Sequence, residues 1–241
     1  MKPIFEHACV INLDSRPDRW EQIQVNLKQA NLPAQRFAAI NIQGLQDNPP
    51  PQALRDFLLQ ADGDGPKAEH KLWATWACLN SHLAVIRQAQ REHWDSVLIL
   101  EDDCVFQPYT PGVLKRVSEQ IATQAWDLLY LGGTLKKGGL HQKTSSNLYR
   151  VNRVRLAHAY VVRATLYERI LQEAPESGLP IDWYYSERLL PSINAYLVDP
   201  LITYQRYADL SDIEQVERKP KLKSRKLFRH WLALLRYGRS F

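Results

Sequence analysis

The sequence predicts an α/β protein with one main domain, a β-α-β start, a mixed central sheet and a basic helical tail. The first observation is composition, since the 241 residues are 45% hydrophobic, which suits one large core. The second is order, since short apolar runs alternate with helical patterns at first and the later half is richer in strands. The third is charge, since residues 218–241 carry nine Lys or Arg and no Asp or Glu. We therefore expect a domain over residues 1–217 and a separate tail over residues 218–241.

The first 40 residues read as a β-α-β unit. Residues 7–13 form a short apolar run typical of a buried strand. Residues 15–18, Ser-Arg-Pro-Asp, have the composition of a helix start, and the helix should end near Asn31. Residues 35–40 then predict a second strand, parallel to the first and joined to it by a right-handed crossover. No GxGxxG follows the first strand, which disfavours a dinucleotide-dependent dehydrogenase.

A loop region with a short helix at 52–60 is expected next, because proline and glycine clusters flank it. A long helix over about 71–93 follows, with apolar residues at steps of three and four on one face. The elements expected after it are strands at 96–100, 126–131, 148–151, 156–162 and 195–198, and helices at 110–123, 164–174 and 182–190.

Three adjacent carboxylates, Glu101, Asp102 and Asp103, follow the strand at 96–100. In an open α/β sheet, ligands bind beyond the carboxyl ends of the strands. If the chain stays extended, Glu101 and Asp103 lie on one side and Asp102 on the other. Carboxylate oxygens suit a hard divalent cation, Mn²⁺ or Mg²⁺, and such a cation often also binds substrate phosphates. The simpler alternative is a solvated acidic turn.

Seven segments in order resemble glycosyltransferase family 25, whose members include bacterial lipopolysaccharide and lipooligosaccharide galactosyltransferases. These segments are VINLDSRPDRW (10–20), ACLNSHLAVI (77–86), VLILEDDCVF (97–106), WDLLYLGG (126–133), HAYVV (158–162), PID (180–182) and LSDI (210–213). The resemblance implies a GT-A-like fold over residues 1–217, a UDP-linked sugar donor and a divalent metal held by the acidic motif. Several members transfer with inversion.

The resemblance also implies roles for matching positions. For the metal, Asp103 is the first choice, with Glu101 and Asp212 beside it. For the donor, the implied residues are Asn12, Leu13, Asp14, Arg16, Arg19, Ser81, His82, Glu101 and Asp102. Where the family often has a GEIGC-like run, this chain has Ala-Thr-Trp-Ala-Cys at 74–78, which puts a donor contact by that turn in doubt.

An inverting transfer needs a base for the acceptor hydroxyl, and Asp182 is the candidate. Its alternative is a helix N-cap, because it follows Pro180 and precedes a helical pattern. Trp183 and Tyr184 could stack on an acceptor sugar, and His158 could contact substrate or simply pack in the core. His82 could contact the donor or could simply be a helix histidine with its hydrogen bonds satisfied. Arg16 and Arg19 could bind the donor or could be charges on the helix surface.

Location and partners are expected from simple features. The N-terminal apolar run is too short for a signal peptide, and the three cysteines form no CxxC motif, so we expect a cytoplasmic protein with reduced, buried thiols. A basic amphipathic helix from about Lys223, with Leu227, Trp231, Leu234 and Leu235 on one stripe, would contact anionic lipid on the inner face of the membrane. A basic tail without a partner is the alternative. Nucleic acid is not an expected partner, because residues 1–217 carry a net charge of −4, the total of +5 less the tail's +9.

The sequence thus predicts a metal-dependent glycosyltransferase that moves a sugar, galactose by resemblance, from a UDP-sugar to a surface-polysaccharide or lipooligosaccharide acceptor. One alternative is a metal-dependent phosphodiesterase or nucleotidyltransferase, which would need a second acidic cluster. The other is an inactive scaffold that keeps the fold.

Overall fold

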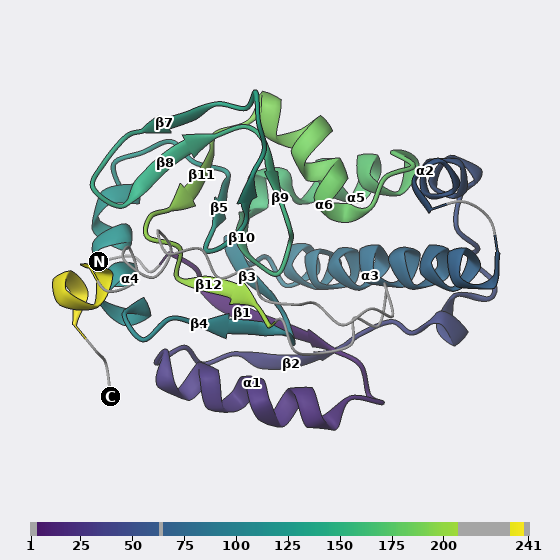
Figure 1. Cartoon of the computed structure of the whole chain (residues 1–241), viewed down its shortest axis with the longest axis horizontal. Helices are drawn as coiled ribbons and strands as arrows, with labels where there is room; N and C mark the ends of the chain where they lie inside the picture. Colours follow the sequence, from purple (N-terminus) through teal and green to yellow (C-terminus); the bar gives the residue numbers. More distant parts are fainter. Residues whose placement is uncertain (1–3, 63–64, 207–231, 239–241) are drawn as a thin grey trace.

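The computed structural model describes residues 4–62, 65–206 and 232–238 (Figure 1). Its strands are β1 (His7–Asn12), β2 (Gln35–Ala38), β3 (Ser96–Glu101), β4 (Cys104–Phe106), β5 (Leu128–Tyr130), β6 (Thr134–Leu135), β7 (His141–Lys143), β8 (Leu148–Val151), β9 (Val154–Arg155), β10 (Ala159–Arg163), β11 (Ala195–Val198) and β12 (Thr203–Gln205). Its α-helices are α1 (Pro17–Gln29), α2 (Gln52–Asp62), α3 (Pro66–Arg91), α4 (Thr110–Ile121), α5 (Tyr167–Glu176) and α6 (Ile181–Tyr184). Shorter turns are η1 (Ile42–Leu45), η2 (Ala164–Leu166), η3 (Tyr185–Leu189) and η4 (Leu190–Ser192).

An eight-stranded sheet in the order β2-β1-β3-β10-β5-β11-β8-β7 forms the centre. β1 is parallel to β2 and β3, whereas β10 is antiparallel to both β3 and β5. The expected parallel β-α-β start and the mixed sheet are therefore confirmed. Because β10 runs against its neighbours, it begins at the edge of the sheet where β3 ends. The loop before β10 and the acidic residues after β3 consequently meet at that edge.

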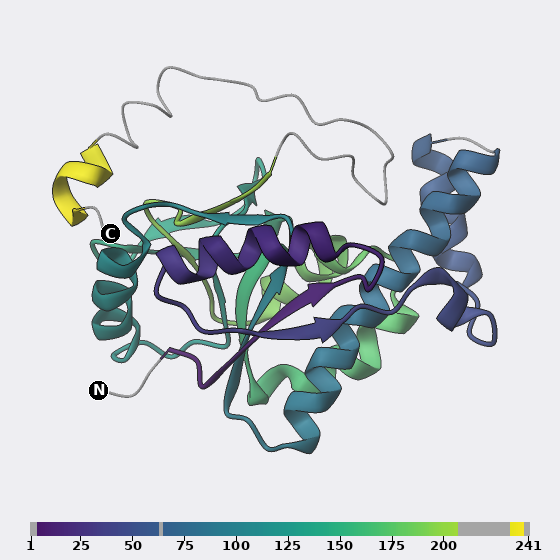
Figure 2. The same cartoon turned by 90° about the horizontal axis from the view of Figure 1, so that it is seen from below.

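The sheet has helices on both faces (Figures 1 and 2). α1 and α4 cover one face, where they pack on Val10, Leu98 and Leu100. α3, α5 and α6 cover the other face, where Ile99 and Tyr160 are buried. Successive residues of β3 thus alternate between the two apolar cores, as the pleat of a strand requires. This alternation places the side chain of Glu101, the last residue of β3, on the α3 side of the sheet.

The predicted elements differ from the structure mainly at their ends. α3 begins at Pro66, five residues before the expected start, with Pro at its first position and Glu69 in its first turn. The helix expected at 182–190 is split, because α6 is followed by the π-helical turn η3 and the 3₁₀ turn η4. The strand expected at 156–162 begins only at Ala159, and β9 precedes it as a separate short strand.

Part of the basic tail packs on the domain. Residues 232–237 are helical, Ala233 is buried, and the Tyr237 hydroxyl accepts a hydrogen bond from Asn147 Nδ2 at 2.8 Å. Leu235 is 66% exposed. Leu227 and Trp231, two members of the expected apolar stripe, lie outside the described residues, so the lipid contact stays a prediction. Within the described ranges, none of the helices has both the length and the hydropathy needed to cross a membrane.

Candidate active site

The end of β3 divides the acidic triplet between the two faces of the sheet. Val97 and Ile99 belong to the core under α3, and Glu101 follows them on that side. Asp102 follows Leu98 and Leu100 toward α1. This separation of Glu101 from Asp102 is the one that strand alternation predicts. The extended segment stops at Glu101, because Asp102 and Asp103 form a turn before β4.

On the α1 side, Asp102 is held by two protein groups. Asn12 Nδ2 donates a hydrogen bond to Asp102 Oδ2 at 2.8 Å, and Arg19 Nη1 lies 3.2 Å from Oδ1. Asp102 is 8% exposed, and burial raises the pKa of its carboxyl even though Arg19 and Asn12 oppose the shift. The carboxylate therefore connects the end of β3 to β1 and α1.

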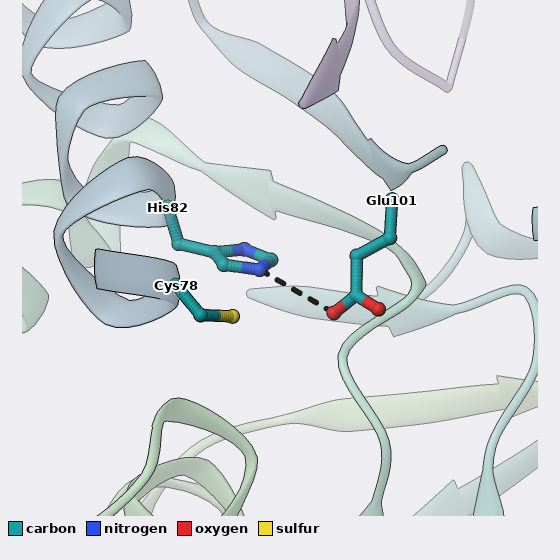
Figure 3. Close-up of side chains that lie close together, drawn as sticks. All are labelled: Cys78, His82 and Glu101. Carbon is teal, nitrogen blue, oxygen red and sulfur yellow. Dashed lines mark ion pairs between the residues drawn. The ribbon is translucent and has the colours of Figure 1, made fainter. Parts of the chain in front are cut away.

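On the α3 side, Glu101 faces His82 (Figure 3). His82 is fully buried, and its Nε2 lies 3.5 Å from Glu101 Oε1. Gln205 donates a hydrogen bond to Glu101 Oε2 at 3.0 Å. Burial would raise the pKa of Glu101, but His82, His158 and Gln205 outweigh it and lower the pKa below its ordinary value. Glu101 is therefore poised as an anion at this edge.

Gln205 lies beside Glu101 because β12 pairs with β4, the strand after the acidic turn, and Gln205 stands opposite Cys104. The start of β12 also lies against the end of β5. The Ile202 N–H donates to the Leu131 carbonyl at 3.1 Å, next to Gly132. A Cβ on Gly132 would lie 2.5 Å from the Thr203 carbonyl oxygen and 2.7 Å from His158 Nε2. Only glycine leaves room for this approach.

Cys78 lies one helical turn before His82 on α3. Its sulfur, His82 and a Glu101 oxygen all lie within 4.8 Å of one another. Burial, together with the nearby carboxylates of Glu101 and Asp182, raises the pKa of the Cys78 thiol well above its ordinary value. The thiol is therefore protonated in the protein alone.

Asp182 lies in the first turn of α6, and Pro180 occupies the N-cap position. The Leu156 N–H donates to Asp182 Oδ2 at 3.2 Å. Leu156 has φ = 74°, a conformation that costs a bulky residue free energy. Burial raises the pKa of Asp182; the Leu156 N–H and Arg155 oppose that shift, and Glu101 adds to it. A carboxylate with a raised pKa is the kind of group that serves as a general base.

Arg155 lies beside Asp182 and is buried. Its Nη2 lies 2.9 Å from Glu187 Oε1, and its guanidinium stacks 3.6 Å from the centre of the Trp183 ring. Trp183 is 39% exposed, and its ring forms a T-shaped contact with the ring of Phe57, with 4.9 Å between the ring centres. Trp183 therefore presents a rigid, partly exposed ring next to Asp182.

Two of the residues expected to contact the acceptor are buried. Tyr184 is 1% exposed and donates a hydrogen bond to Glu173 at 3.0 Å, so its ring has no exposed face in this structure. His158 is 1% exposed, and its Nε2 lies 3.2 Å from the Thr203 hydroxyl. Of the three expected acceptor residues, only Trp183 has a solvent-exposed ring that an acceptor could contact.

The remaining predicted donor residues lie around the end of β1. Arg16 forms two hydrogen bonds with Asp18. Asp14 lies in the turn that follows Leu13 and pairs with Arg36 at 2.5 Å. Ser81 accepts a hydrogen bond from the Ile40 N–H at 2.9 Å and so joins α3 to the segment after β2. Asp103 accepts the Arg206 N–H on its backbone carbonyl at 2.8 Å. Asp212 lies outside the described residues.

The reasoning from sequence missed Cys78 and Arg155. The sequence predicts buried thiols, but Cys78 is only partly buried, unlike Cys9 and Cys104. The spacing of four between Cys78 and His82 on a predicted helix indicates a shared face. Arg155 lies on β9, which has only two residues, too few for a sequence pattern to indicate that its side chain is buried beside Asp182.

Comparison with known proteins gives the family. The profile of glycosyltransferase family 25, described as an LPS biosynthesis protein, matches residues 5–172. The chain belongs to this family. The match covers β1 to most of α5, including Glu101, His82 and Arg155, which agrees with the predicted GT-A-like fold class. Family membership supports a transferase.

Individual relatives are distant. A glycosyltransferase 25 family member of Aedes aegypti is 30% identical over 52% of this chain and 21% of its own length. The inactive glycosyltransferase 25 family member 3 of Homo sapiens is 27% identical over 53% and 22%. Procollagen galactosyltransferase 1 of Danio rerio is 21% identical over 90% and 36%. The chain thus spans about a fifth to a third of these curated relatives. A solved glycosyltransferase involved in glycosylation of the PBCV-1 major capsid aligns at 12% identity, over 95% of this chain and 99% of its own, with a TM-score of 0.41.

Proposed function

We propose that this glycosyltransferase transfers a sugar, galactose in the first instance, from a UDP-linked donor to a glycan or glycolipid acceptor, with inversion and with a divalent cation. The observation that carries the proposal is the family match over residues 5–172 combined with an anionic Glu101 and a partly buried Asp182 of raised pKa at one edge of the sheet. The names of relatives, which include a galactosyltransferase, support galactose. A cytoplasmic location with contact to the inner face of the membrane is part of the same proposal.

The donor side is proposed to use the acidic turn. The oxygens of Glu101 and Asp103 suit Mn²⁺ or Mg²⁺, and Asp212 is proposed as a further metal contact. When bound, such a cation would supply Lewis-acid stabilisation to the departing diphosphate. Asp102 already accepts hydrogen bonds from Asn12 and Arg19, so its proposed contribution is to fix the turn from which Asp103 projects.

The acceptor side is proposed to use Asp182 and Trp183. Asp182 would take the proton from the acceptor hydroxyl as that oxygen attacks the anomeric carbon. The Leu156 N–H holds the carboxylate in a fixed orientation, and the raised pKa of Asp182 brings its basicity nearer to neutral pH. The exposed part of the Trp183 ring is suited to packing on the apolar face of a sugar.

A second candidate function is an inactive scaffold of the same fold. Two observations favour it. The matching human relative is named inactive, and residues 74–78 depart from the GEIGC-like run of the family. A scaffold would bind no UDP-sugar in a metal-dependent way. The phosphodiesterase or nucleotidyltransferase alternative has no observation that favours it over sugar transfer.

Calorimetry of donor binding tests the proposal. UDP, UDP-galactose, UDP-glucose and UDP-N-acetylhexosamines would be titrated with Mn²⁺ and with EDTA into the wild type, Asp103→Asn and the control Asp95→Asn. Asp95 precedes β3 at the opposite end of the strand, so its variant matches the charge change away from the site. We expect Mn²⁺-dependent binding that Asp103→Asn loses and Asp95→Asn keeps. Absence of binding to every UDP compound would overturn the UDP-donor assignment and favour the scaffold.

A further inference from the structure

Three different donor atoms converge beside the end of β3. Cys78 and His82 share one face of α3 because they are four residues apart. Glu101 reaches them from β3, and Figure 3 shows the three side chains pointing toward a common centre. The sulfur, a ring nitrogen and a carboxylate oxygen all lie within 4.8 Å of one another. Sulfur, nitrogen and oxygen together form a different ligand set from the all-oxygen set of the acidic turn.

The ring of His82 is held so that Nε2 faces this centre. On its other side, Nδ1 lies 3.0 Å from the Tyr160 hydroxyl, which in turn lies 3.0 Å from the Tyr185 hydroxyl. His82 is fully buried, and in the described part of the chain no hydrogen-bond partner is found for Nε2, which lies 3.5 Å from Glu101 Oε1. Metal-binding histidines are oriented in this way, through a hydrogen bond on the second ring nitrogen.

We propose that Cys78, His82 and Glu101 bind a borderline-soft divalent cation of the Zn²⁺ or Co²⁺ type. Thiolate and imidazole ligands favour such ions over Mg²⁺. In a tetrahedral site with bonds of about 2.0–2.2 Å, nitrogen and oxygen ligands lie roughly 3.3–3.6 Å apart. The separation of 3.5 Å between His82 Nε2 and Glu101 Oε1 fits that range. Binding would replace the thiol proton of Cys78 by the metal.

Three protein ligands leave a fourth position open to water or substrate, as in catalytic zinc sites. Glu101 belongs both to this site and to the proposed donor site. A zinc-type ion would therefore hold Glu101 against α3 and compete with a hard cation that uses the same carboxylate. The inference itself does not require sugar transfer, because it depends only on the ligand set and its geometry.

Titration of the full chain with Co²⁺ tests the site, with the absorption spectrum as the readout. We expect one equivalent to produce the visible bands of four-coordinate cobalt and a near-ultraviolet band from thiolate-to-cobalt charge transfer. Zn²⁺ should displace the cobalt, whereas Mg²⁺ should not. Cys78→Ala should abolish the charge-transfer band. Tyr160→Phe should keep the band but weaken cobalt binding by roughly 10–100-fold, because it frees the ring of His82.

Two controls separate the outcomes. Cys9→Ala, which removes a buried thiol from the core against which Cys78 packs, should keep the charge-transfer band. Asp103→Asn should keep it too while losing Mn²⁺-dependent UDP binding, so that failure of one site is distinguished from failure of the other. A wild-type spectrum without the charge-transfer band, or a band that survives Cys78→Ala, would overturn the proposal. Circular dichroism and thermal melts would verify that each variant is folded.

Discussion

The two sides of the β3 end are built from similar residues and arranged differently. On the α1 side, both oxygens of Asp102 have partners at hydrogen-bond distance, Asn12 and Arg19. On the α3 side, Glu101 and His82 stand at 3.5 Å, and a raised-pKa carboxylate, Asp182, and a raised-pKa thiol, Cys78, lie near them. Burial raises the pKa of Asp102 as well as that of Asp182, so the two sides differ in their partners and not in their pKa shifts. Paired buried polar groups such as Asp102 stabilise a fold, whereas His82 Nε2 has no hydrogen-bond partner among the described residues and can accept a ligand. We therefore expect substitutions on the α1 side to act mainly on stability and substitutions on the α3 side to act mainly on activity.

Replacing Asp182 by Asn should give the largest effect. Loss of the proposed base should reduce kcat about a thousandfold, equivalent to about 4 kcal/mol of activation free energy. Stability should stay the same or rise, because burial disfavours the charged carboxylate and Asn carries no charge. A transfer assay and a thermal melt on the same preparation measure both. A large loss of stability with unchanged kcat would place Asp182 on the structural side of the comparison.

Replacing Asp102 by Asn should act mainly on stability. It removes the carboxylate that faces the buried Arg19 and should lower the free energy of unfolding by about 3 kcal/mol. Urea unfolding measures the change. Asp18→Asn is the matched control, because the Arg16–Asp18 pair is exposed and should contribute little. Equal effects of the two substitutions would contradict the structural role of Asp102.

Replacing Glu187 by Gln should have the smallest effect, about 1 kcal/mol at neutral pH. Although burial raises the pKa of Glu187, Arg153 and Arg155 outweigh it and lower that pKa. A lowered pKa in the folded state stabilises the fold above the unfolded value of about 4.3. That contribution is lost as the pH falls through the lowered pKa. The difference in unfolding free energy between wild type and Glu187→Gln should therefore shrink below about pH 4, and a difference independent of pH would contradict the role of its charge.

The sequence was sufficient to predict which face of the sheet Glu101 and Asp102 occupy. Strand alternation placed Glu101 and Asp102 on opposite faces, because each follows the parity of the buried residues before it. The same rule could not place Asp103, since the chain turns after Glu101. The partner of Asp182 could not be predicted either, because the N–H that it accepts belongs to Leu156, 26 residues away, in a conformation that few leucines adopt.

Aromatic and sulfur residues were the hardest to interpret. Trp183 and Tyr184 are adjacent and equally suited to a sugar by type, but α6 turns one outward and the other toward Glu173. Which of the two rings is exposed depends on where α6 begins, and the sequence does not define that start to within one residue. Cys78 was judged by its spacing to other cysteines, whereas its significance comes from His82 on the same helix and from Glu101 across the sheet.

Gly132 shows how the end of one strand sets the position of another. Because Gly132 has no Cβ, Thr203 at the start of β12 can lie directly against the end of β5. Position 132 therefore tolerates no side chain. Even an alanine there would displace the segment around Thr203. Diversity at this point of the edge therefore has to come from the neighbouring side chains that face the site, because position 132 has no room for a side chain of its own.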